Sequence, residues 1–132
     1  MAQITKRDML NQHNPPVSYG DCFRACLATL FGVLTKEVPN FVEISDEGWW
    51  DVVNEWTQTR GWHAVHFECH NGWTAPGWAI ACGKSNKSLL QHAVVYRDGD
   101  LWHDPAASRS GLSEINGYIV FIPTLATFER LL

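Results

Sequence analysis

The chain lacks any stretch in which lysine and arginine gather, and its 132 residues carry a formal net charge of −4. A nucleic-acid groove needs positive charge to neutralise phosphates, so we expect no nucleic-acid partner. No run of 18 apolar residues occurs in the sequence, so we expect no membrane span. The N-terminal stretch MAQITKRDMLNQHNPP lacks the apolar core of a signal peptide, which indicates a cytoplasmic protein.

Disulfides and metal-binding motifs are also not indicated. Cysteines stay reduced in the cytosol, and the four in this chain include no C-x-x-C pair. A zinc protein is an alternative, but the spacing of its candidate ligands is poor. These ligands would be Cys22, Cys26, Cys69, His70 and Cys82. The sequence therefore predicts no metal and no other cofactor.

Helical patterns occupy the first half of the chain. Apolar residues at spacings of three and four in DCFRACLATLF predict a helix over 21–31. Asp21 is a suitable N-cap for this helix, and Gly32 is a suitable stop. The stretch SDEGWWDVVNEWTQTRG predicts a second helix over 45–61.

Strand patterns follow the second helix. Five short segments are rich in β-branched and aromatic residues and are separated by turn residues: WHAVHFE, GWAIACG, HAVVYRD, LWHDP and GYIVFIP. TLATFERLL predicts a last helical turn or two. Helices followed by an antiparallel meander indicate the α+β class. The length fits a single domain over residues 1–132, with N-terminal helices packed on a sheet of about five strands.

Cys22 is the first candidate for chemistry, because it directly follows the expected N-cap. The start of a helix carries partial positive charge, which favours a thiolate over a thiol when a protonated histidine is also near. The alternative is that Cys22 is a small buried hydrophobic residue. Cys26, one turn later, and Cys82, in a strand, are expected to be core residues.

The stretch QHAVVYRDGDLWHDP predicts a hairpin that carries a candidate base, His92, and a candidate orienting carboxylate, Asp104. A three-residue loop ending at Gly99 would place the two side chains opposite each other. A two-residue loop would place them on opposite faces of the sheet. We expect the three-residue loop, with a positive φ at Gly99. His103 should then face away from Asp104, as an exposed or structural residue.

Two motifs together resemble a known family. GDCFRACLATLFGVLTKEVPNF and HAVVYRDGDLWHDP resemble small papain-like cysteine peptidases of bacteriophages and bacteria, near the branch that cleaves bacteriocin leader peptides. The resemblance covers residues 20–41 and 91–112. It implies a papain-like fold, in which the helix of the nucleophile packs on an antiparallel sheet.

The resemblance also implies roles for individual residues. Cys22 matches the nucleophile, His92 the general base and Asp104 the residue that orients the base. Papain-like enzymes use an upstream glutamine as an oxyanion donor, and the prolines in NQHNPP occupy its usual position. Gln12 and Asn14 are the side-chain amides available for that role.

The function indicated is therefore a cysteine hydrolase that acts on a peptide, amide or isopeptide bond. Its partner would be a peptide or protein substrate. A deamidase or an acyltransferase would use the same residues. A non-catalytic binding module is another alternative, with an aromatic groove built from Trp73, Trp78 and Trp102.

Overall fold

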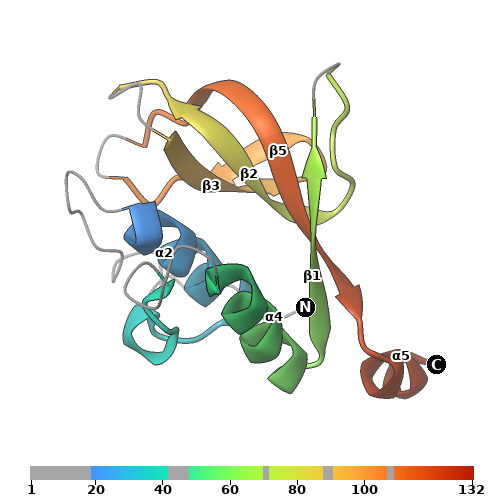
Figure 1. Ribbon diagram of the computed structural model, residues 1–132. Coiled ribbons are helices and arrows are strands. Elements are labelled where there is room, and N and C mark those ends of the chain that lie inside the picture. Colours follow the sequence, from blue (N-terminus) through green and yellow to red (C-terminus); the bar gives the residue numbers. More distant parts are fainter. Residues whose placement is uncertain (1–18, 42–47, 70–71, 88–90, 107–108) are drawn as a thin grey trace.

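The computed structural model describes residues 19–41, 48–69, 72–87, 91–106 and 109–132 of the chain (Figure 1). Helices come first within these ranges and strands follow, as predicted. The elements in chain order are α2 Tyr19–Phe31, η1 Thr35–Glu37, α4 Trp49–Thr59, β1 Trp62–Glu68, β2 Trp78–Ser85, β3 Gln91–Arg97, β4 Asp100–His103, β5 Leu112–Pro123 and α5 Leu125–Leu131.

All five strands belong to one antiparallel sheet with the order β1-β5-β2-β3-β4. The predicted α+β class and the five antiparallel strands are confirmed, but the predicted meander is wrong, because β5 lies between β1 and β2. Strand β5 pairs with β1 along one edge and with β2 along the other. Residues 117–123 of β5 pair with β1, and residues 112–120 pair with β2.

Helices α2 and α4 cover one face of the sheet, with α2 against β3 and α4 against β1 (Figure 1). The larger hydrophobic core lies between these layers. Phe31, at the end of α2, joins the layers, because its ring lies 5.3 Å from that of Trp56 and 5.5 Å from that of Phe121. The positive φ of Gly32, 67°, ends α2 as predicted.

A second, smaller core lies on the opposite face of the sheet. It contains Cys69, Ala75, Ala79, Ala81, Val94 and Tyr118. The Cys69 thiol donates a hydrogen bond to the carbonyl oxygen of Trp73 at 2.9 Å, which ties down the segment that leads from β1 to β2. This face therefore holds a cysteine that is separated from the three on the helical side.

The chain ends in the short helix α5, which confirms the predicted last turn or two. Thr124 precedes this helix, and its hydroxyl oxygen accepts a hydrogen bond from the backbone N–H of Thr127, at 3.4 Å. No helix within the described ranges is long and apolar enough to cross a membrane.

Gly83 allows β2 and β5 to approach each other beside the start of β3. The β2–β5 register shifts between Cys82 and Gly83, and Gly83 pairs with His92 on the other side. A Cβ atom at position 83 would collide with the carbonyl group of Glu114. Only glycine fits there, so the backbone that carries His92 has a neighbour without a side chain.

Candidate active site

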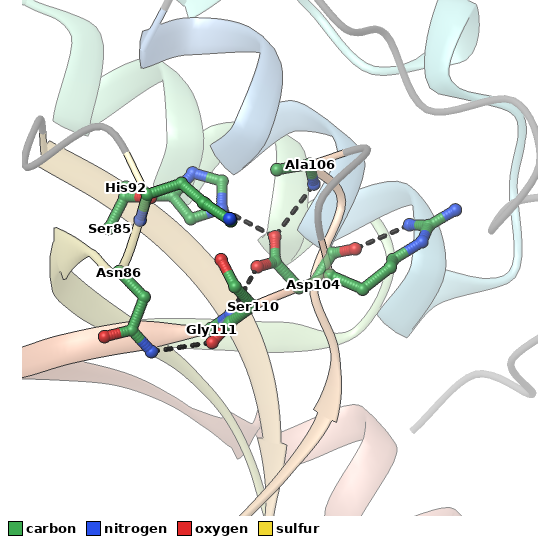
Figure 2. A network of polar contacts seen from close by, with 9 residues as sticks. Ser85, Asn86, His92, Asp104, Ala106, Ser110 and Gly111 are labelled. Atoms are coloured by element: carbon green, nitrogen blue, oxygen red, sulfur yellow. Dashed lines mark hydrogen bonds and ion pairs between the residues drawn. The ribbon is translucent and has the colours of Figure 1, made fainter.

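The Asp104 carboxylate is buried and accepts three hydrogen bonds (Figure 2). Oδ1 lies 2.6 Å from His92 Nε2 and 2.8 Å from the backbone N of Ala106, while Oδ2 lies 2.7 Å from the backbone N of Gly111. Burial raises the pKa of Asp104, but these hydrogen bonds outweigh it and hold the pKa below the ordinary value. The carboxylate is therefore ionised at neutral pH and held from both oxygens.

The His92 imidazole interacts with both Asp104 and Cys22. Burial lowers the pKa of His92, but the hydrogen bonds to Asp104 and to Cys22 raise it to about 9. Because Nε2 faces Asp104, Nδ1 is the ring nitrogen left for the thiol. His92 is thus oriented by one partner and presented to the other. The structure therefore brings together the three residues that the sequence nominated.

Cys22 is the fourth residue of α2 and is half-buried. The helix begins at Tyr19, so the prediction that Asp21 is the N-cap is wrong: Asp21 already has helical backbone. A residue type that is favoured at caps is also tolerated in the first turn, where its negative charge meets the positive end of the dipole. The thiol keeps its predicted place near the start of the helix.

The loop between β3 and β4 differs from the predicted one. Arg97 pairs with Asp100, so the loop has the two residues Asp98 and Gly99 and not three. Their φ values are 50° and 90°, and two successive positive values are typical of a type I′ turn. Gly99 has the predicted positive φ, but this loop alone would place Asp104 and His92 on opposite faces.

A β-bulge corrects the side-chain alternation. Tyr96 pairs with Leu101, but Val95 pairs with His103, so Trp102 is an extra residue in β4. One extra residue reverses the alternation for everything that follows it. Asp104 therefore reaches the side of the strand on which His92 lies. The two side chains meet as predicted, although through a bulge and not through a longer loop.

Two further thiols lie near Cys22, and neither is suited to nucleophilic attack. Cys26 is completely buried and Cys82 is half-buried, and both contribute to the core on the helical side. Burial, then the charge of Cys22, raises the pKa of Cys82 to about 12. The same two causes come first in raising the pKa of Cys26. Both thiols stay protonated at neutral pH, as expected of core residues.

His103 is buried, with 4% of its surface exposed, so the alternative of an exposed His103 is wrong. Pairing with Val95 places it on β4, before the chain turns at Asp104. Burial and then the charge of Arg109 lower its pKa to about 4, although the charge of Asp104 opposes them. Its Nε2 has no hydrogen-bond partner among the residues that the structure describes.

The candidate zinc ligands do not all come together. Cys69 lies in the core on the opposite face from Cys26 and Cys82, and His70 is outside the described residues. Within the described part of the chain, no group of three or more histidine, cysteine or acidic side chains could hold a metal ion. The arrangement thus gives the zinc alternative no support.

The three tryptophans of the expected groove fall into two groups. Trp78 and Trp102 are in contact, with ring centroids 5.4 Å apart. Trp73 instead packs on Tyr118, at 5.8 Å. Trp78 pairs with Arg97, five residues along β3 from His92, which is roughly 17 Å along a strand. A single groove that joins all three rings to the site is therefore not formed by these contacts.

The two candidate oxyanion side chains, Gln12 and Asn14, lie outside the described residues. The backbone is the other source of donors. N–H groups in the first turn of a helix have no acceptor within the helix, so the start of α2 offers such donors near Cys22.

Sequence reasoning missed the groups that hold Asp104. These are the backbone N–H groups of Ala106 and Gly111 and the guanidinium of Arg109, which donates to the carbonyl oxygen of Asp104 at 2.6 Å. One signal was available. An aspartate that opens a turn commonly accepts the N–H group two residues later, which here is that of Ala106.

Comparisons with protein-family models, with curated proteins and with solved structures gave no match for this chain.

Proposed function

We propose that the chain is a thiol hydrolase with a papain-like fold, in which Cys22, His92 and Asp104 form a catalytic triad. The observation that carries this proposal is the 2.6 Å contact between His92 Nε2 and Asp104 Oδ1, and a hydrogen bond with Cys22 also contributes to the raised pKa of His92. A nucleophile, a base and an acceptor that orients the base match the requirement for covalent catalysis. The substrate would be a peptide, amide or isopeptide bond in a peptide or protein.

The first half of the reaction forms an acyl-enzyme. In the first step, before the substrate is attacked, the proton of the Cys22 thiol passes to His92 Nδ1, where the raised pKa of the imidazole keeps it, and the thiolate sulfur then attacks the carbonyl carbon of the substrate. The carbonyl oxygen becomes an oxyanion, which backbone N–H groups at the start of α2, with Gln12 or Asn14, would stabilise. The tetrahedral species collapses, the C–N bond breaks, and the leaving amine takes the proton from His92.

The second half releases the acyl group. His92 removes a proton from water, the resulting hydroxide attacks the thioester carbon, and the C–S bond breaks. The sulfur of Cys22 recovers the proton from His92, and the product is a carboxylic acid. The raised pKa of His92, about 9, supports this cycle because the imidazolium formed in the first step is stabilised by Asp104. A deamidase or acyltransferase would share the acyl-enzyme.

Acyl-enzyme formation tests the proposal without knowledge of the natural substrate. A thiol ester should appear on Cys22 when the protein is mixed with p-nitrophenyl acetate at pH 7, quenched in acid and mapped by mass spectrometry. The acetyl group should then be lost on incubation, with further turnover of the ester. Cys22→Ser and His92→Ala should each reduce turnover at least about 100-fold, in line with the loss of a triad member.

The buried thiols provide the control. Cys26→Ala removes a sulfur atom from the same helix without touching the hydrogen bonds of His92, so turnover should stay within about twofold of wild type. Equal acetylation of wild type and His92→Ala would contradict the proposal. An acetyl group that stays on Cys22 without turnover would contradict it as well.

A further inference from the structure

The peptide group that joins Ser110 to Gly111 is bonded on both of its edges. Its N–H group, from Gly111, donates to Asp104 Oδ2 at 2.7 Å. Its carbonyl oxygen, from Ser110, accepts a hydrogen bond from the side-chain Nδ2 of Asn86, also at 2.7 Å. Figure 2 shows Asn86 and Asp104 on either side of this segment. The orientation of one peptide plane thus depends on both residues.

This peptide plane needs to be fixed, because glycine leaves it free to turn. Gly111 has φ of 77°, a value that other residues rarely adopt. Rotation of the plane by half a turn would bring φ of Gly111 to a negative value, which glycine tolerates equally well. The turned peptide would point the Ser110 carbonyl oxygen towards the Asp104 carboxylate, where two negative ends would repel each other.

Asn86 is placed by the sheet to choose between these orientations. It directly follows β2, and its backbone N–H donates to the carbonyl oxygen of Gly111 at 3.0 Å, which continues the β2–β5 ladder by one bond. The backbone bond holds position 86 beside the segment, and the side-chain amide then selects the orientation of the Ser110–Gly111 peptide.

We infer that Asn86 is a positioning residue of the site: its side-chain amide locks the Ser110–Gly111 peptide so that the Gly111 N–H holds Asp104 against His92. The inference rests on the proposed function, because it assigns Asn86 a part in presenting His92 to Cys22. The hydrogen bonds of Asn86 described above go to Ser110 and Gly111, and not to His92 or to the sulfur of Cys22. Its effect passes through one peptide and one carboxylate.

The experiment follows two quantities in the full chain: the pH titration of His92 by NMR, and the rate of Cys22 alkylation by limiting iodoacetamide at pH 6. Asn86→Ala should lower the titration midpoint of His92 towards its ordinary value and slow alkylation roughly 2- to 10-fold, the effect of losing one hydrogen bond. Asn86→Gln, which keeps a side-chain amide donor, should recover part of both. Gly111→Ala, which disfavours the positive φ, should act like Asn86→Ala.

Asn54→Ala is the matched control. Asn54 accepts one hydrogen bond from the backbone N of Ala64, at 3.2 Å, where α4 meets β1. Asn54→Ala removes the same type of side chain and one hydrogen bond as Asn86→Ala. It should therefore lower the free energy of unfolding by a similar amount and leave the titration of His92 unchanged.

Each outcome decides a different claim. If the titration of His92 is the same in wild type and Asn86→Ala, the inference is wrong, whatever the reactivity of Cys22. An equal shift in Asn54→Ala would also overturn it, since the effect would then be general loosening. If His92 shifts as expected but Cys22 of the wild type reacts no faster than an ordinary thiol, the positioning by Asn86 stands and the proposed function fails.

Discussion

The start of β3 and the end of β4 each hold a histidine close to Asp104, and the two histidines behave in opposite ways. Burial lowers the pKa of both. At the start of β3, the hydrogen bonds of His92 to Asp104 and Cys22 outweigh burial and raise its pKa to about 9. At the end of β4, no such bond from the described part of the chain opposes burial and the charge of Arg109, and the pKa of His103 falls to about 4.

The difference teaches that a direct hydrogen bond decides protonation here, whereas proximity to a carboxylate does not. His103 adjoins Asp104 in sequence, yet the carboxylate is turned towards His92 and the backbone N–H groups of Ala106 and Gly111. The negative charge of Asp104 therefore stabilises one imidazolium strongly and the other weakly. A histidine that holds its proton beside a thiolate needs the first environment, and a neutral core residue needs the second.

The largest effect is expected from changes at Asp104 itself. Asp104→Ala removes all three accepted hydrogen bonds and leaves His92 without its partner, so it should destabilise the fold by about 3–5 kcal/mol. Cys22 alkylation at pH 6 should slow about tenfold or more, because less imidazolium is present to stabilise the thiolate. Asp104→Asn keeps the hydrogen-bonding shape and should lose less on both counts.

Urea unfolding followed by circular dichroism gives the stability of each variant, and iodoacetamide labelling of the folded proteins gives the rates. Three superimposable pH profiles of alkylation for wild type, Asp104→Asn and Asp104→Ala would mean that Asp104 plays no part in the site.

An intermediate effect is expected in the pH dependence of stability. The folded-state pKa of His92, about 9, lies above the ordinary 6.5, so its contribution is fully present below pH 6.5 and is lost as pH rises through 9. The folded-state pKa of His103, about 4, lies below 6.5, so stability falls as pH drops from 6.5 towards 4. A shift of this size corresponds to about 3 kcal/mol.

Single variants should separate these two slopes. His92→Gln should flatten the loss of unfolding free energy between pH 6.5 and 9, and His103→Gln should flatten the loss between pH 6.5 and 4, in urea unfolding under reducing conditions. If both variants change the pH dependence of stability on the same side of pH 6.5, the contrast between His92 and His103 is wrong.

The smallest effect is expected from Arg109→Gln. Arg109 is exposed, and its charge is the second cause of the lowered pKa of His103 after burial. Removal of that charge should raise the pKa of His103 and shift His92 much less, because Arg109 reaches His92 only indirectly, through its hydrogen bond to the carbonyl oxygen of Asp104. NMR titration of both imidazoles measures this, and an equal shift at His92 would contradict the separation of the two environments.

Much of the fold could be predicted because it depends on local patterns. Apolar spacing located α2 to within two residues of its start, and short β-branched segments located the strands. The N-terminal part of β5 was missed because Ser113 and Glu114 are exposed polar residues, which resemble a loop. Their strand conformation comes from pairing with β2, a contact between distant parts of the sequence.

The site could be predicted in its residue types but not in its geometry. The hairpin sequence nominated His92 and Asp104, and the register depended on a bulge at Trp102 that the local pattern does not encode. Trp102 packs on Trp78, from a different strand, so the bulge accompanies a tertiary contact. The hold of Asn86 on the Ser110–Gly111 peptide likewise joins segments 24 residues apart.

The most direct test of the account is the pH profile of Cys22 alkylation in wild type and His92→Ala. Limiting iodoacetamide is added to separate samples at pH values from 5 to 10. Intact-mass analysis counts the labels, and peptide mapping identifies the labelled cysteines. We predict one fast label at Cys22 in the wild type that persists down to pH 6. The rate in His92→Ala should instead rise only near pH 8.5, where ordinary thiols ionise. Coincident profiles in two folded proteins, or labels spread equally over Cys22 and Cys69, would contradict a nucleophile activated by His92.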